Sequence, residues 1–112
     1  MIFIRLKINV LPNQRNAFEK KILATIAPTK KESGCINYSI HTELTNQNCY
    51  TILEEWENRA DVIKYIKSKT FGDLLGINNY LERPFKIDIY TIQIEEGEET
   101  VKTIRNIRSN LY

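Results

Sequence analysis

Several residue types that build common catalytic and metal sites are scarce in this chain. Its 112 residues include one His, two Cys and four Gly. A zinc site needs about four N, S or O ligands, which one His and two Cys supply only with the help of carboxylates. The sequence also lacks a Gly-rich phosphate loop and a Ser/His/Asp arrangement. We therefore expect no metal, haem, flavin or nucleotide cofactor.

Cys35 and Cys49 belong to a predicted β-hairpin, on which we expect them to lie several residues apart along the strands. Bridged cysteines have Cα atoms about 4.4 to 6.8 Å apart, and a strand advances about 3.3 Å per residue. The sequence therefore predicts two free thiols.

The chain also lacks a strong excess of positive or negative charge, and it lacks long apolar runs. The 16 Lys and Arg residues are interspersed with 14 Asp and Glu residues, so no basic face for nucleic acid is indicated. No apolar run approaches the roughly 20 residues that a membrane-spanning helix needs. The start, Met1–Arg5, has the alternation of a strand instead of the pattern of a signal peptide. We expect one cytoplasmic domain without a nucleic-acid or membrane partner.

The stretch 32–58 predicts a β-hairpin. Apolar and polar side chains alternate over 36–41, and Tyr50–Leu53 is a second β-prone run. Between them, Thr45–Asn48 is polar, and Asn tolerates positive φ, so we expect the chain to reverse there. Asn58, just after the second run, is a candidate helix cap.

The rest of the chain adds a strand on each side of the hairpin and two helical regions. Apolar residues alternate along 2–10, which predicts a strand buried on one face. A helix follows, with Asn13 as its cap and Pro28 near its end. A second helical region begins at Asn58 and is interrupted by glycines. A last strand runs through Phe85–Thr91.

The order βαββαβ predicts an α+β, ferredoxin-like protomer, with both helical layers on one face of a four-stranded antiparallel sheet. The other face would be uncovered, and it carries mixed residues that include Tyr90 and Ile92. Burial of that face against a second copy is favourable, so we expect a homodimer. We assign residues 1–94 to this domain.

Residues 95–112 are predicted to form an amphipathic tail that is helical or partly disordered. An acidic segment, Glu95–Glu99, precedes Val101, Ile104 and Leu111 at helical spacing, with basic residues among them. Such a tail could dock on the partner subunit, fray or bind something else, and the sequence does not choose among these.

Four features together resemble the antibiotic biosynthesis monooxygenase (ABM) family over roughly residues 1 to 92. They are Pro12 after the first strand and the segments 32–38, 54–58 and 65–71, which read ESGCINY, EEWEN and YIKSKTF. The resemblance implies a dimeric α/β barrel of ferredoxin-like protomers. For the family's enzymes it implies a cofactor-independent oxidation of quinol-like or polycyclic aromatic molecules by O₂.

One position departs from the family pattern. Many relatives carry a His six residues before the counterpart of Phe71, where this chain carries Tyr65. A phenol has a pKa of about 10 and is mostly a fixed hydrogen-bond donor unless its environment shifts that pKa. The similar haem-degrading enzymes would need a set of Asn, Trp and His around the haem, and this chain has neither a Trp in place of Tyr65 nor a His near Leu75.

The chemistry itself requires a pocket that holds an aromatic ring, excludes water and favours deprotonation, because an electron-rich phenolate can supply the first electron to O₂. We predict that Tyr38, Trp56 and Phe71 bind the ring. We predict that Tyr65 and His41 are the catalytic groups. Strand alternation puts His41 and Tyr38 on opposite faces, so that they share a pocket only if a bulge intervenes.

A competing interpretation is a non-catalytic, dimeric small-molecule-binding or stress-associated protein of the same fold. Tyr65 in place of His favours it, and the aromatic residues would then be core or interface side chains. Glu54 and Glu55 point to opposite faces of one strand, which argues against a carboxylate pair sharing a proton. We expect one of them to form a salt bridge with Arg5 or Lys7.

Overall fold

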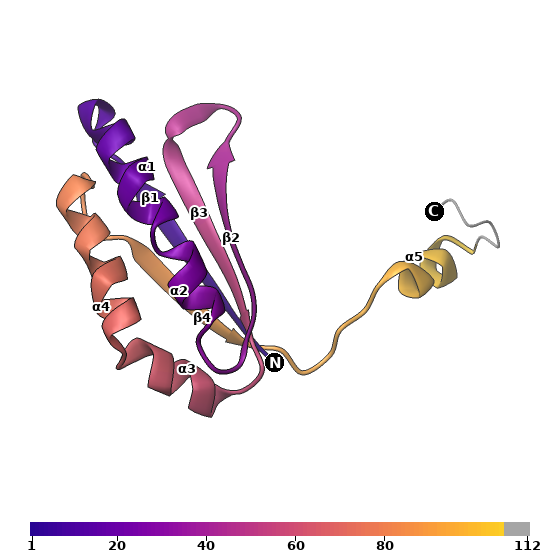
Figure 1. The fold of residues 1–112 in the computed structure, drawn as a ribbon. Helices are drawn as coiled ribbons and strands as arrows, with labels where there is room; N and C mark the ends of the chain where they lie inside the picture. Colours follow the sequence, from indigo (N-terminus) through magenta and orange to yellow (C-terminus); the bar gives the residue numbers. More distant parts are fainter. Residues whose placement is uncertain (107–112) are drawn as a thin grey trace.

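The computed structural model describes residues 1–106, in which a four-stranded antiparallel sheet carries helices on one face (Figure 1). The strands lie in the spatial order β2-β3-β1-β4 and are β1 (Ile2–Asn9), β2 (Cys35–Glu43), β3 (Asn46–Trp56) and β4 (Lys86–Thr91). The helices are α1 (Arg15–Leu23), α2 (Ile26–Lys30), α3 (Arg59–Ile66), α4 (Lys69–Leu75) and α5 (Glu98–Arg105), with 3-10 turns η1 (Pro12–Gln14) and η2 (Gly76–Tyr80). The predicted ferredoxin-like βαββαβ order is confirmed.

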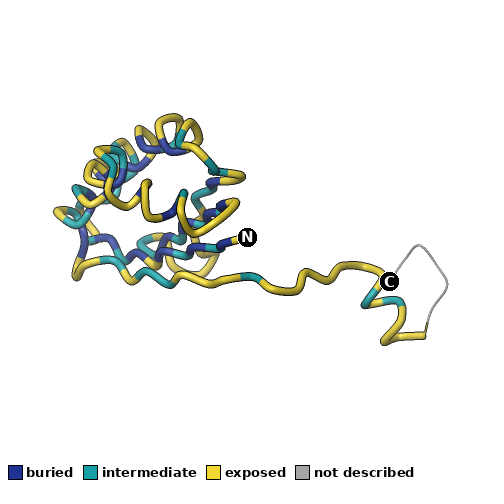
Figure 2. Tube along the Cα trace, turned by 90° about the horizontal axis from the view of Figure 1, so that it is seen from below, coloured by how far each residue is buried: buried dark blue, intermediate teal, exposed yellow. Residues whose placement is uncertain are grey.

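The core lies between the sheet and the helices, as the colours of Figure 2 show. Strand β1 alternates as predicted, and its apolar side chains on the helix side are at most 4% exposed: Ile2, Ile4, Leu6 and Ile8. We call the face of the sheet that points away from the helices the open face. It carries Phe3, Arg5 and Tyr90, and the rings of Phe3 and Tyr90 lie 6.3 Å apart.

The predicted salt bridge from Glu54 or Glu55 to Arg5 or Lys7 is wrong. Arg5 Nη2 lies 3.3 Å from Asp88 Oδ2. The strand register explains the difference, because Arg5 stands opposite Asp88 on β4 and opposite an apolar residue on β3.

Two helix starts were predicted, and one of them is confirmed. Asn58 Oδ1 accepts a hydrogen bond from Asp61 N (3.0 Å) and caps α3. Asn13 does not cap α1, because it lies inside η1 and α1 begins at Arg15. Pro28 lies in the first turn of α2, where its missing N–H costs no helical hydrogen bond.

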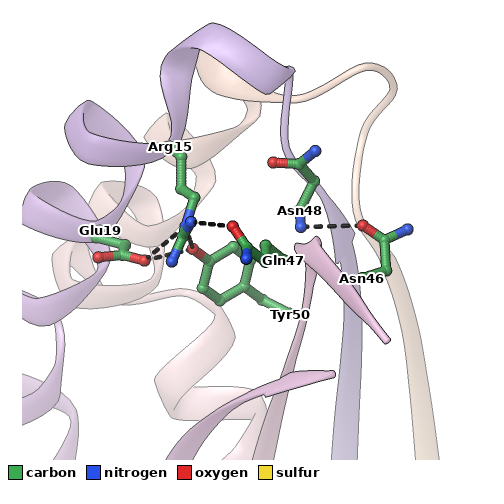
Figure 3. A network of polar contacts seen from close by, with 6 residues as sticks. All are labelled: Arg15, Glu19, Asn46, Gln47, Asn48 and Tyr50. Atoms are coloured by element: carbon green, nitrogen blue, oxygen red, sulfur yellow. Dashed lines mark hydrogen bonds and ion pairs between the residues drawn. The ribbon is translucent and has the colours of Figure 1, made fainter. Parts of the chain in front are cut away.

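The hairpin reverses slightly earlier than predicted, at Leu44–Thr45, so that β3 already begins at Asn46. Side-chain bonds explain why the polar residues extend the strand instead of forming the turn (Figure 3). Asn46 Oδ1 accepts from Asn48 N (3.0 Å), and Gln47 Oε1 accepts from Arg15 Nη1 (2.7 Å).

The two thiols are free, as predicted. Cys35 stands opposite Trp56 in the sheet, and Cys49 stands opposite Asn9. The strand register therefore keeps the two cysteines well apart.

The tail contains α5, which an extended segment separates from the sheet and its helices (Figure 1). In the structure α5 spans Glu98–Arg105, and the rest of the predicted helical pattern, to Leu111, lies outside the described residues. Among residues 1–106, no helix has the length and apolar character needed to cross a membrane.

Candidate functional site

Four of the predicted site residues meet in one buried group, here called the aromatic cluster. Tyr38 comes from β2, Trp56 from the end of β3, Tyr65 from α3 and Phe71 from α4. The rings of Trp56 and Tyr65 stack with centroids 4.5 Å apart, and Phe71 meets Tyr65 edge-on at 5.3 Å. All four are at most 8% exposed.

The junction between α3 and α4 fixes two of these rings. Ser68 Oγ donates to Tyr65 O (2.5 Å) at the end of α3 and accepts from Phe71 N (3.2 Å) at the start of α4. One hydroxyl thus closes one helix and caps the next. Because both bonds are to backbone atoms of cluster residues, they set the positions from which the two rings contact each other.

Glu54 is the cluster residue that we did not predict. It is 0% exposed and stands opposite Tyr38 in the sheet, on the same face as Trp56. Trp56 Nε1 donates to Glu54 Oε1 (2.9 Å), whereas Oε2 has no partner among the described residues. Burial raises the pKa of Glu54 to about 7, and the bond from Trp56 opposes that rise. A buried carboxyl that titrates near neutral pH is a candidate general base.

A sequence signal for Glu54 did exist. Tyr50, Ile52, Glu54 and Trp56 alternate along β3, and all four side chains are buried on the helix side. A carboxylate at the buried parity of a strand is costly unless it is paired or protonated. This position on the buried face, which the neighbouring Glu55 does not share, would have identified Glu54 as a candidate functional residue.

The two phenols of the cluster are hydrogen-bond donors at neutral pH. Tyr38 Oη lies 2.9 Å from Thr25 Oγ1, and Thr25 Oγ1 donates its own proton to Ile22 O (2.6 Å), so Tyr38 is the donor of the pair. Burial raises the pKa of Tyr38 to about 12. Burial, followed by the charge of Glu54, also raises the pKa of Tyr65 well above its ordinary value. The Tyr65 hydroxyl is buried without a partner in residues 1–106.

His41 lies elsewhere. It is exposed on β2, and its Nε2 lies 2.8 Å from Ser39 Oγ, a neighbour on the face opposite Tyr38. No bulge brings it beside the cluster, because the register shifts of β2 fall at Cys35/Asn37 and Thr42/Glu43. Within one protomer, Glu54 rather than His41 is therefore the group placed to act as a base in the cluster.

Two surface pockets border α1. One, of about 210 Å³, lies between α1–α2 and α4 and is lined by Lys21, Ala24, Thr25, Pro28, Thr70 and Asp73. The other, of about 230 Å³, lies between α1–α2 and the hairpin and is lined by Glu19, Ile22, Leu23, Ile26, Ile40, Thr42 and Tyr50. At its edge Tyr50 donates to Glu19 (2.5 Å, Figure 3), and this bond holds the pKa of Glu19 below its ordinary value.

The sequence matches the antibiotic biosynthesis monooxygenase (ABM) family over residues 1–75. The chain belongs to this family. The matched part contains every residue of the aromatic cluster together with Glu54, whereas β4 and α5 lie beyond it.

Solved structures support the ABM fold. A conserved protein from Methanosarcina mazei Go1 is 30% identical, with a TM-score of 0.77 over 82% of this chain and 92% of its own. An antibiotic biosynthesis monooxygenase has a TM-score of 0.76 over 84% of this chain and all (100%) of its own, but at 15% identity this likeness shows the fold alone. An uncharacterized protein of Synechocystis sp. is 30% identical over 86 residues. The aligned region covers 76% of this ABM chain and 58% of that protein, so the chain spans less than two thirds of that relative's length.

Proposed function

We propose that this ABM protein is a cofactor-independent monooxygenase that oxidises a quinol-like aromatic molecule with O₂. The observation that carries this proposal is Glu54, a buried carboxyl with a pKa near 7 and one unpaired oxygen, set among aromatic side chains. A phenol has a pKa of about 10, so transfer of its proton to such a carboxylate costs about 4 kcal/mol. Transfer to an ordinary carboxylate would cost about 7 to 8 kcal/mol. The burial of Glu54 thus removes a large part of the barrier to forming the phenolate.

The proposed reaction begins when a quinol hydroxyl loses its proton to Glu54. The phenolate gives one electron to O₂, and the two radicals combine into a peroxide on a ring carbon. Loss of water from that peroxide leaves one oxygen atom on the carbon, so the quinol becomes a hydroxyquinone and the second oxygen atom becomes water. The unpaired Tyr65 hydroxyl supplies a hydrogen-bond donor for the oxygen anions that form on the way.

The experiment is oxygen uptake by the purified protein with a panel of hydroquinones and naphthols, without added metal or flavin. We expect turnover to rise with pH through about 7, as the Glu54 carboxylate forms. Glu54→Gln should lower turnover by at least about a hundredfold. Glu57→Gln is the matched control, because Glu57 is exposed beyond the end of β3, and it should leave turnover unchanged. Equal turnover in Glu54→Gln would show that Glu54 is not the base.

A non-catalytic small-molecule-binding protein of the same fold is the second candidate function. The close contact of Trp56, Tyr65 and Phe71 favours it, because these rings fill the space between them. This candidate predicts that a quinol binds but that no quinol or naphthol raises oxygen uptake above the uncatalysed rate.

We also propose that two copies associate through their open faces. Phe3 and Tyr90 give this face aromatic area. Arg5 Nη2 pairs with Asp88 (3.3 Å) and donates to Tyr90 Oη (2.9 Å) within the protomer. Lys7 and Lys86 stand opposite each other on the same face and would need partners from the second copy. The dimeric barrel expected from the ABM fold has this arrangement.

A further inference from the structure

The tail helix α5 lies by itself. The extended segment 92–97 carries it away from the sheet and from the other helices (Figure 1, Figure 2). Val101 and Ile104 lie one turn apart on the same side of α5, and Ile104 is 78% exposed. Isolated helices shorter than about 12 to 15 residues are marginal in water, and α5 has only 8 residues. This helix therefore gains stability by packing its apolar side against another surface.

The pocket between α1–α2 and the hairpin, here called the hairpin groove, is an apolar surface that the protomer leaves uncovered. Its walls include Ile22, Leu23 and Ile26 from the two helices and Ile40 from β2, and Leu23 is 62% exposed. The groove has a volume of about 230 Å³. Because a cavity of about 150 Å³ already holds benzene, the groove has room for one or two aliphatic side chains. It thus matches the apolar side of α5 in size and in chemistry.

The rim of the groove adds charge complementarity. The bond from Tyr50 holds the pKa of Glu19 below its ordinary value, so this rim carboxylate is charged at neutral pH. The bonds that Tyr50 and Arg15 donate to Glu19 both end on Oε1, which leaves Oε2 for a further cation. Arg105 lies one turn after Val101 and makes no ion pair with any described residue. It can therefore reach the rim when the apolar side of α5 enters the groove.

The tail starts at the edge of the proposed dimer interface. Strand β4 is one edge of the sheet, and β2, which lines the groove with Ile40 and Thr42, is the other edge. When two copies pack through their open faces about a two-fold axis parallel to the strands, β4 of each copy lies over β2 of the other. Segment 92–97 spans about 20 Å when extended, twice the roughly 10 Å between packed sheets. The tail can therefore pass around the partner's β2, whereas in its own copy the width of the sheet separates β4 from the groove.

We infer that α5 of each copy docks in the hairpin groove of a second copy of this chain. Val101 and Ile104 fill the groove, and Arg105 pairs with Glu19 of the partner subunit. Each copy supplies one helix and one groove, so the exchange is reciprocal and closes the dimer. This inference rests on the proposed open-face dimer, and it adds the surface that the tail recognises.

Disulfide cross-linking between two co-expressed full-length variants tests the contact. Both carry Cys35→Ser and Cys49→Ser; one also carries Ile104→Cys on α5, and the other carries Leu23→Cys in the groove. We expect oxidation to give a linked band of about 26 kDa, twice the 13.2 kDa chain, whereas neither variant alone should link. Thr42→Cys, on the opposite wall of the groove, is a second probe in place of Leu23→Cys.

Thr103 provides the matched control on α5. It lies on the side of the helix opposite Val101 and Ile104, because successive residues turn by about 100°, so Thr103→Cys should link far more slowly than Ile104→Cys. Dimer affinity is an independent measurement. Ile104→Glu should raise the dissociation constant of the dimer at least about tenfold in analytical ultracentrifugation, and Thr103→Glu should leave it unchanged.

The outcomes separate this inference from the proposed function. The docking is overturned, and the open-face dimer stands, if the protein is a dimer in which neither groove cysteine links to Ile104→Cys. The same holds if Ile104→Glu dimerises as tightly as the wild type. A monomeric wild type contradicts both the dimer and the docking. Oxygen uptake with the quinol panel tests the monooxygenase separately, because α5 lies apart from the aromatic cluster.

Discussion

At Glu54, the burial that makes the carboxyl a candidate base also makes its ionisation costly to the fold. Its pKa rises from an ordinary 4.5 to about 7. In the folded state the carboxyl therefore holds its proton up to a higher pH than in the unfolded state. The contribution of Glu54 to the free energy of unfolding is therefore fully present below about pH 4.5. It is lost as the pH rises through 7, and the total loss is about 3 kcal/mol.

We predict that the free energy of unfolding of the wild type falls between pH 5 and pH 8, measured by urea denaturation. Glu54→Gln, which stays neutral, should lose most of that slope, and the difference between the two proteins should approach about 3 kcal/mol at pH 8. A parallel pH dependence in both proteins would mean that Glu54 keeps an ordinary pKa.

The two buried tyrosines permit a matched comparison. Tyr65→Phe removes a hydroxyl without a partner, so we expect stability to be unchanged or higher by about 1 kcal/mol. Tyr38→Phe removes the bond to Thr25 and should cost about 1 kcal/mol. Thermal unfolding measures both. If the monooxygenase proposal holds, Tyr65→Phe also lowers turnover with the fold intact, and unchanged kinetics would assign Tyr65 to packing.

At the scale of elements, the loop between α2 and β2 is tied to the start of α3. Gly34 has a φ of +82°, and a Cβ built on it would clash with the Asp61 side chain. Its carbonyl accepts a hydrogen bond from Glu57 N (2.9 Å). The glycine of the ESGC segment is therefore required both by its backbone conformation and by the close approach of α3.

We predict that Gly34→Ala destabilises the protein by about 1 to 3 kcal/mol, because it combines a left-handed backbone with a steric clash. Gly72→Ala is the control. It lies in α4 with open space around the new methyl group, and it should stabilise the protein by about 0.5 to 1 kcal/mol. Chemical denaturation of the two variants gives the comparison, and a neutral Gly34→Ala would mean that the loop relaxes away from α3.

At the scale of the whole molecule, the open face is the feature that the protomer leaves incomplete. Helices cover one side of the sheet only (Figure 1), while Phe3, Leu53 and Tyr90 remain partly exposed on the other. Apolar area of this kind in a small domain is usually covered by a partner.

We predict a homodimer of about 26 kDa, twice the 13.2 kDa chain, in light scattering at micromolar concentration. Leu53→Glu places a charge in the middle of the open face and should give monomers. Leu44→Glu, at the fully exposed hairpin tip, is the control and should leave the mass unchanged. A monomeric wild type would contradict the proposed dimeric barrel.

The order of the elements and the faces of the strands could be predicted from the sequence, because alternation has a period of two and each side chain's parity fixes its face. For this reason the helix side of β1 was predicted correctly. The free thiols were predicted from the rise along the strands, and the Asn58 cap from the preference of Asn for that position. Turn and helix boundaries were less accurate. The hairpin turn and the start of α1 depend on side-chain bonds such as Gln47 to Arg15, which join residues distant in the chain.

Composition and local pattern alone determined the fold class and the aromatic residues available to a site. The tertiary structure decided which of them meet. Tyr65 reaches Trp56, and Phe71 reaches Tyr65, because Ser68 joins the two helices that carry them. Glu54 acquires a pKa near 7 because burial removes it from water. Burial and desolvation are properties of neighbours brought together by folding, so a one-dimensional pattern indicates a carboxylate on the buried face but not the energy of its ionisation.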